Sequence, residues 1–136
     1  METILKIEEA QFDTEDRLKT EANPYERFGC DGYVITTDTQ EIKLGITTGQ
    51  QCCEVWGYFM SQDNPSDFVG SHLLGVSITD DKLRTHQLLD FDGVAMFVNV
   101  QTDRGLLQFV AYNEHNGYYG HMACVLSNQI NHSEMI

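Results

Sequence analysis

Basic residues are scarce in this chain, and that scarcity limits what the protein can bind. Eight lysines and arginines stand against 21 aspartates and glutamates, so the formal charge is −13. A field of this sign repels nucleic-acid phosphates and anionic lipids, which argues against direct binding to either. The same field attracts a strongly basic partner, and the most consistently basic surfaces in cells are those that hold DNA or RNA. An acidic decoy for such a surface is therefore one function to consider.

The chain also lacks segments that would direct it into a membrane or out of the cell. Residues 1–9 have neither the basic start nor the apolar run of a signal peptide, and no window reaches membrane-spanning length. We therefore expect a cytosolic protein. Thiols stay reduced in that compartment, which favours metal binding or burial over a disulfide framework for the four cysteines, Cys30, Cys52, Cys53 and Cys124.

The length of the chain, 136 residues, suits one domain with one core. A chain of this size buries roughly two thirds of the surface that its unfolded form exposes. Charge is concentrated on the N-terminal side, because residues 1–41 carry eleven acids and four bases, whereas residues 105–136 carry two acids and no base. We expect a single domain over residues 1–136, with an acidic N-terminal part, 1–41, and a motif-bearing region at about 42–126.

Alternation of apolar and polar residues predicts a mainly β fold, of the α+β class, with an antiparallel sheet or a partial barrel. One or two short helices are expected, the clearer one at residues 64–69, where Pro65 follows an N-cap residue and Gly70 would end the helix. A weaker helical pattern covers residues 13–23. The polar tail from Ser127 to Ile136 is expected to fray. The predicted strands are 33–37, 42–47, 73–79, 94–101, 106–113 and 122–126, with a turn near Asp38 and another at residues 102–105.

Two motifs predict a zinc site. Cys52 and Cys53 are adjacent, and His115 and His121 flank a loop that contains two glycines. Two thiolates and two imidazoles are the ligand set of a closed, tetrahedral structural zinc site. A five-residue loop would place the two histidines directly across a hairpin, with alpha carbons about 5 Å apart.

The residues leave alternatives open at this predicted site. Neighbouring side chains in a strand point in opposite directions, so the case for one thiolate is stronger than the case for both, and Glu54 is the nearest substitute ligand. The cysteines could instead be two buried hydrophobes, and the histidines could be turn residues that stack on tyrosines. The other histidines, His72, His86 and His132, are interpreted as ordinary surface or core groups, and the aromatic residues Trp56, Tyr58 and Phe59 as core residues.

The segments CCEVWGYF at 52–59 and HNGYYGH at 115–121 resemble a family of small phage and bacterial proteins labelled as a domain of unknown function. The resemblance covers about residues 42–126. In size and acidity the chain is also similar to phage anti-CRISPR proteins of type II-A, which inhibit Cas9, and some of these bind metal.

This second resemblance implies a phage protein that acts in the host bacterial cytoplasm, as a monomer or dimer, without direct contact with nucleic acid. Cas9 holds its guide and target in positively charged channels, so an acidic protein could occupy the recognition lobe or the DNA channel and block DNA binding or loading. No catalysis would be needed. The candidate acidic positions are Glu8, Glu9, Asp13, Glu15, Asp16, Asp63, Asp67, Asp80, Asp81, Asp90 and Asp92.

A zinc-dependent hydrolase is the alternative function. Cys53, His115 and His121 would hold the metal, and Glu54 would act as the base on a bound water. Against it, the chain lacks the motifs of zinc deaminases and of zinc metalloproteases. A receptor for a small signalling nucleotide is a third possibility, which the strongly acidic charge disfavours.

Overall fold

The computed structural model describes residues 1–13, 29–48, 55–61, 64–79, 94–114 and 121–136, which form β-strands and one short 3-10 helix. The chain is mainly β, with almost no helix, and folds as a single domain. The elements are β1 (Ile4–Asp13), β2 (Gly29–Thr37), β3 (Glu41–Thr47), β4 (Val55–Met60), η2 (Pro65–Phe68), β5 (Leu73–Thr79), β6 (Val94–Thr102), β7 (Gly105–Glu114), β8 (Met122–Leu126) and β9 (Asn131–Met135).

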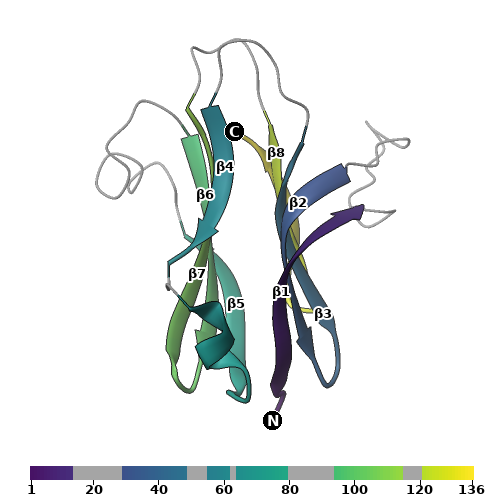
Figure 1. The fold of residues 1–136 in the computed structure, drawn as a ribbon, viewed down its shortest axis with the longest axis vertical. Coiled ribbons are helices and arrows are strands. Elements are labelled where there is room, and N and C mark those ends of the chain that lie inside the picture. Colours follow the sequence, from purple (N-terminus) through teal and green to yellow (C-terminus); the bar gives the residue numbers. More distant parts are fainter. Residues whose placement is uncertain (14–28, 49–54, 62–63, 80–93, 115–120) are drawn as a thin grey trace.

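The strands form two antiparallel sheets that face each other (Figure 1). One sheet has five strands in the order β1-β2-β3-β8-β9, and the other has four in the order β4-β7-β6-β5. Most neighbours in each sheet are also close in sequence, so hairpins build most of the fold.

The predicted partial barrel is wrong, because the two sheets do not close on each other. Among the described residues their edges meet at one isolated antiparallel bridge, between Thr3 and His72. Next to it, the amide of Ile4 donates to the carbonyl of Ser71 over 2.9 Å, and the amide of Gly70 donates to the carbonyl of Ile4 over 2.8 Å. Closing a barrel depends on strand tilt and stagger over the whole sheet, which a strand pattern in the sequence does not encode.

Six of the predicted strands are confirmed. The first two form the expected hairpin, β2 with β3, in which Ile35 lies opposite Ile42. The predicted turn at residues 102–105 joins β6 to β7, and Gly105 adopts a φ of 126°. The bounds of β5 and β8 agree with those predicted, Leu73–Thr79 and Met122–Leu126.

The predicted fraying of the C-terminal tail is wrong. Asn131–Met135 forms β9, which pairs with β8, and Ile136 is 3% exposed. The sequence of β9 is polar because the strand lies at a sheet edge, where pairing on one side and a few apolar neighbours are enough to hold it. Strands β1 and β4 were also not predicted. In β1 the register shifts between Ile4 and Lys6 and acidic residues follow, so the sequence shows little alternation.

The predicted short helix at residues 64–69 is present as the 3-10 helix η2. Pro65 lies at its start, and Gly70 follows its end with a φ of 91°, which is strained for residues other than glycine. The second predicted helix, at residues 13–23, falls outside the described residues except for Asp13, which ends β1. In the described part of the chain, no helix has the length and apolar character needed to span a membrane.

The hydrophobic core lies between the two sheets. One face of β6 is fully buried, at Met96, Val98 and Val100. The opposite face of β6 is also buried at Ala95 and Phe97, which pack with Val110 in a smaller second cluster. Both faces of this central strand are therefore covered, which fits its nearly continuous apolar sequence.

Candidate functional site

The one predicted zinc ligand within the described residues, His121, is held firmly in the structure. Its side chain and backbone are almost fully buried, at 2% exposure, and its ring lies 4.7 Å from the ring of Trp56. The backbone of His121 exchanges two hydrogen bonds with Ile136, of 2.9 and 2.7 Å. Its Nδ1 atom lies 2.7 Å from the carbonyl oxygen of Thr47, at the end of β3.

The contact with Thr47 determines which ring nitrogen of His121 carries a proton. A carbonyl oxygen can only accept a hydrogen bond, so Nδ1 must donate, and in the neutral imidazole the lone pair is then on Nε2. Histidines that bind metals commonly donate their other ring N–H to a backbone carbonyl in this way. The tautomer of His121 is therefore the one that a metal bound at Nε2 requires.

The remaining predicted ligands, Cys52, Cys53 and His115, and the substitute Glu54, lie outside the described residues. The described residues that flank them come together. Val55 pairs with Glu114 across β4 and β7, and Thr47 of β3 contacts His121. Within the described ranges, no group of three or more histidines, cysteines or acids could hold a metal ion.

The structure separates the predicted acidic positions that it describes. Glu8 and Glu9 are adjacent on β1, so their side chains point to opposite faces of the sheet. Glu8 pairs with Lys6 over 3.1 Å, and Asp67 lies on η2. Asp13 ends β1. The other candidate positions, Glu15, Asp16, Asp63, Asp80, Asp81, Asp90 and Asp92, lie outside the described residues.

An acidic cleft, defined here by Glu9, Gln11, Asp31 and Tyr58, opens between the sheets. These residues, with Ala10, line a cavity of about 340 Å³, and a neighbouring cavity of about 420 Å³ shares Gln11 and Asp31. The register places the polar groups on the core-facing side. Glu9 lies opposite Tyr33, and Gln11 opposite Asp31, which in turn lies opposite the buried Ile46. Residues directly opposite each other in an antiparallel sheet share a face.

The electrostatics of the cleft centre on two tyrosines. The hydroxyl of Tyr58 donates to Oε2 of Glu9 over 2.9 Å. Partial burial, followed by this bond to Glu9, raises the pKa of Tyr58 to about 12, and burial with the charge of Glu9 raises the pKa of Tyr33. Both phenols therefore stay protonated as donors at neutral pH. Oδ1 of Asp31 is buried and accepts no hydrogen bond from the described residues.

Sequence reasoning missed this cleft. Asp31 was not among the predicted acidic positions, and Tyr58 was interpreted as a core residue. The signal was present in β1, where Ile7, Glu9 and Gln11 follow one another at every second position. A face that begins apolar and turns polar along one strand indicates a place where the core gives way to a polar site.

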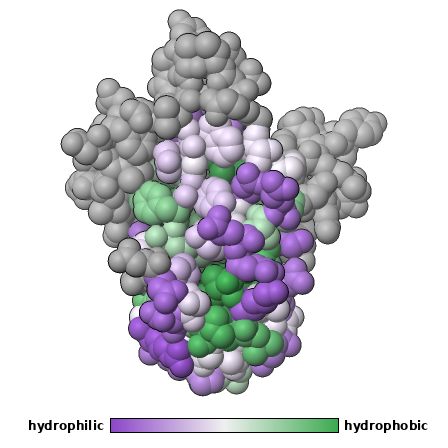
Figure 2. All heavy atoms as spheres, in the orientation of Figure 1, coloured by the Kyte–Doolittle hydropathy of each residue, from purple (hydrophilic) through white to green (hydrophobic). Residues whose placement is uncertain are grey.

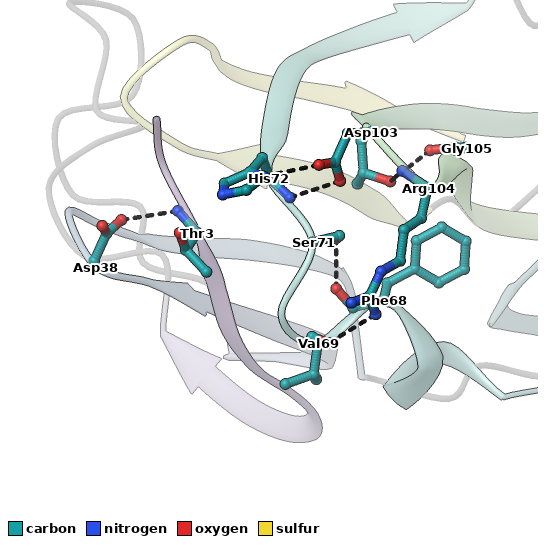
Figure 3. Close-up of polar contacts among 10 residues, drawn as sticks. Thr3, Asp38, Phe68, Val69, Ser71, His72, Asp103, Arg104 and Gly105 are labelled. Carbon is teal, nitrogen blue, oxygen red and sulfur yellow. Dashed lines mark hydrogen bonds and ion pairs between the residues drawn. The ribbon is translucent and has the colours of Figure 1, made fainter.

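Where the sheet edges meet, at the bridge between Thr3 and His72, each of these residues also bonds to an aspartate, Thr3 to Asp38 and His72 to Asp103 (Figure 3). We call this the β1–β5 corner, defined by Thr3, His72 and Asp103. Asp103 accepts from the backbone amide of His72 over 2.9 Å and contacts its Nδ1 atom over 2.8 Å. The guanidinium of Arg104 donates to the carbonyl oxygens of Asp67 and Val69, over 2.7 and 3.0 Å. These contacts fasten the β6–β7 turn to the connection between η2 and β5.

In the β1–β5 corner, the contact between the imidazole of His72 and the carboxylate of Asp103 holds the β6–β7 turn against the start of β5. The hydroxyl of Ser71, the residue before His72, is not available to this imidazole–carboxylate pair. It is buried and donates to the carbonyl of Phe68 over 2.5 Å. That bond directs the hydroxyl into the fold, as Figure 3 shows. His132 is likewise paired, with Glu134 over 3.0 Å, and His86 lies outside the described residues. His72 and His132 thus each pair with one nearby carboxylate.

Two of the four cysteines form a buried thiol pair. The sulfur atoms of Cys30 and Cys124 are 3.8 Å apart, and both residues are at most 2% exposed. Contact with Cys30 and burial raise the pKa of the Cys124 thiol. Because the thiolate is the reactive form, Cys124 is protected from oxidation and alkylation.

The visible face of the molecule is mixed in character. Figure 2 shows hydrophilic atoms over much of this face and a hydrophobic area at its lower end, where β5 and η2 lie. Leu74 of β5 is 56% exposed, and Val69, after η2, is 37% exposed. The aromatic residue Phe59, predicted to lie in the core, is 39% exposed on β4.

Fold and site together define a small, acidic protein of two antiparallel sheets with an acidic cleft between them. The chain belongs to the family described as a domain of unknown function, DUF7448, which matches residues 2–125. This match extends over the acidic N-terminal part of the chain, whereas the resemblance noted from the motifs covered only about residues 42–126. No curated protein and no solved structure matches the chain.

Proposed function

We propose that the protein is a stoichiometric, phage-encoded inhibitor of Cas9, which binds a basic nucleic-acid-binding surface of that enzyme. The observation that carries the proposal is the formal charge of −13 on a chain of 136 residues. Carboxylates take the place of phosphates on the recognition lobe or the DNA channel, and target DNA is excluded. The resemblance to anti-CRISPR proteins supports Cas9 as the basic partner and the host bacterial cytoplasm as the place of action.

A DNA-binding assay with guide-loaded Cas9 tests this function. Addition of the protein before target DNA is expected to abolish DNA binding and cleavage, whereas addition after DNA has bound should have less effect. The affinity for Cas9 should fall as ionic strength rises, because charge drives the association. The absence of a complex at low salt would refute the proposal. Glu54→Gln serves as the control, because an inhibitor that acts by binding alone does not need that base.

We also propose a structural zinc ion, held by Cys52, Cys53, His115 and His121. Two observations support it: the tautomer of His121 suits a metal at Nε2, and the described residues that flank the other ligands converge. A closed site with four protein ligands contributes its binding free energy to folding. Its role would be to hold together the ends of β3, β4, β7 and β8.

Metal analysis by inductively coupled plasma mass spectrometry tests the zinc proposal. We expect about one zinc ion per chain, in keeping with a four-ligand site. Cys53→Ser and His121→Gln should lose the metal and melt at a lower temperature. His132→Gln is the matched control, because its imidazole pairs with Glu134 on the surface and should keep the metal. A metal-free wild-type protein, purified without chelators, would contradict the proposal.

A further inference from the structure

The acidic cleft has a composition that the inner face of a β-sandwich rarely has. Inner faces normally carry apolar side chains, because they form the core. Here Glu9, Gln11 and Asp31 occupy inner positions, on the same face as the buried Leu44 and Ile46. Strand β1 bends away from the four-stranded sheet toward its C-terminal end (Figure 1). Glu9 and Gln11 belong to the second half of this strand.

One carboxylate in the cleft, that of Asp31, has a buried oxygen without a hydrogen-bond donor among the described residues. Oδ1 of Asp31 is buried and has no hydrogen-bond partner among the described residues, although Asp31 lines both cavities. A buried oxygen of an ionised carboxylate without a donor is costly, and such a group gains most from a charged donor. The second carboxylate, Glu9, accepts one bond from Tyr58 and retains capacity to accept more.

The aromatic residues of the cleft suit a flat cation. The rings of Tyr33 and Tyr58 lie 5.8 Å apart and nearly perpendicular, and both pack against Phe109, at 6.3 and 6.0 Å. Tyrosine faces attract cations, and they stack well on a planar guanidinium. A guanidinium also has five donors in a fixed fork, enough to serve two separate carboxylates at once.

From these contacts we propose that the acidic cleft binds the guanidinium group of an arginine side chain presented by a protein partner. Asp31 and Glu9 accept its hydrogen bonds, and Tyr58 lines the same cavity. The choice of a protein partner rests on the proposed function, because a basic nucleic-acid-binding surface is rich in exposed arginines. The cleft then supplies the specific contact, and the overall charge supplies attraction at long range.

Titration with N-acetyl-arginine amide, followed by NMR, tests binding without any partner protein. We expect saturable shifts of the amides of residues 9–11, 31 and 58. Asp31→Asn and Glu9→Gln should each weaken binding about tenfold, the effect of one charge-assisted hydrogen bond. Glu8→Gln is the matched control, since it removes the same charge from the opposite face of β1 and should bind as the wild type does.

Two further ligands make the test specific for the guanidinium. N-acetyl-citrulline amide has the same shape without the charge and should not bind, and N-acetyl-lysine amide should bind more weakly because it lacks the planar fork. Equal binding of citrulline, equal binding of lysine, or an equal loss in Glu8→Gln and Asp31→Asn would overturn the proposal.

The same variants separate this inference from the proposed function. Arginine binding in the cleft, without any complex with Cas9, would leave the cleft intact as a site and refute Cas9 as the partner. A second outcome is that the wild-type protein does not bind the arginine amide and that Asp31→Asn inhibits Cas9 as well as the wild type does. This outcome would support the proposed function and overturn the proposal that the cleft binds arginine. Loss of both activities in Asp31→Asn, with an unchanged melting temperature, would support both.

Discussion

The two ends of the space between the sheets differ although strand β1 contributes to both. At the β1–β5 corner, backbone hydrogen bonds join the sheets, and the inner residues are apolar, as at Ile4 and Leu73. At the other end, β1 and β2 present Glu9, Gln11 and Asp31 on that same inner face. One end therefore holds the fold together, and the other is built from groups that bind water or ligands.

This difference teaches where stability and binding are located in the molecule. Apolar burial is the dominant favourable term in folding, and it is supplied by the core cluster that includes Ile35, Leu107 and Phe109. Polar groups at inner positions do not contribute this favourable free energy of apolar burial. Natural proteins depart from local folding rules mainly at functional sites, so the polar end is where binding is expected.

The largest expected effect comes from breaking the apolar end. Leu107→Ala removes a fully buried side chain of β7 and should lower the free energy of unfolding by about 2–5 kcal/mol, because it leaves a cavity. The neighbouring Leu106 is 41% exposed, so Leu106→Ala should change it by only about 0.5 kcal/mol. Urea denaturation of the two variants measures the contrast, and equal losses would show that the core is not located where we describe it.

A smaller effect of opposite sign is expected at the polar end. Asp31→Leu replaces a carboxylate that has an unsatisfied buried oxygen, beside cavities with room for the new side chain. We expect the free energy of unfolding to rise by about 1 kcal/mol. Arginine binding should be lost in the same variant. Glu8→Leu, on the outer face of β1, makes the same change in charge and serves as the control. A marked loss of stability in Asp31→Leu alone would mean that the carboxylate has a structural role.

The smallest effect is expected at Asp103, in the β1–β5 corner. The backbone N–H of His72, and then its side chain, lower the pKa of the Asp103 carboxyl. A carboxyl with a lowered folded-state pKa stabilises the protein above its unfolded pKa, about 4, and this contribution is lost as the pH falls through the folded-state value. Asp103→Asn should therefore melt below the wild type at neutral pH, and the two curves should converge in acid. Parallel curves across that range would contradict the assignment.

The sequence allowed most strands to be predicted, because alternation is strong wherever one face is buried. It failed at β1 and β9, where charge or polarity at a sheet edge hides the pattern, and at β4, whose aromatic residues Trp56, Tyr58 and Phe59 were interpreted as core residues without a strand being predicted. It also failed on barrel closure, which depends on contacts between distant strands. His121 was singled out as a zinc ligand, which stays a prediction, and its contact with Thr47 could not be foreseen because it joins positions 74 apart in sequence. The cleft was missed because its acids come from two strands, and only the register of Glu9 and Asp31 brings them to one face.

The inward carboxylate of Glu9 also affects how separate molecules behave toward one another. Strand β1 is an edge of its sheet, and an exposed edge is a template on which another copy can add a strand. A charge that points inward from an edge strand makes such stacking costly, because the added sheet would bury it. Acidification toward the sequence pI of about 4.5 reduces the negative net charge, so colloidal stability in concentrated solution should decline as the pH falls.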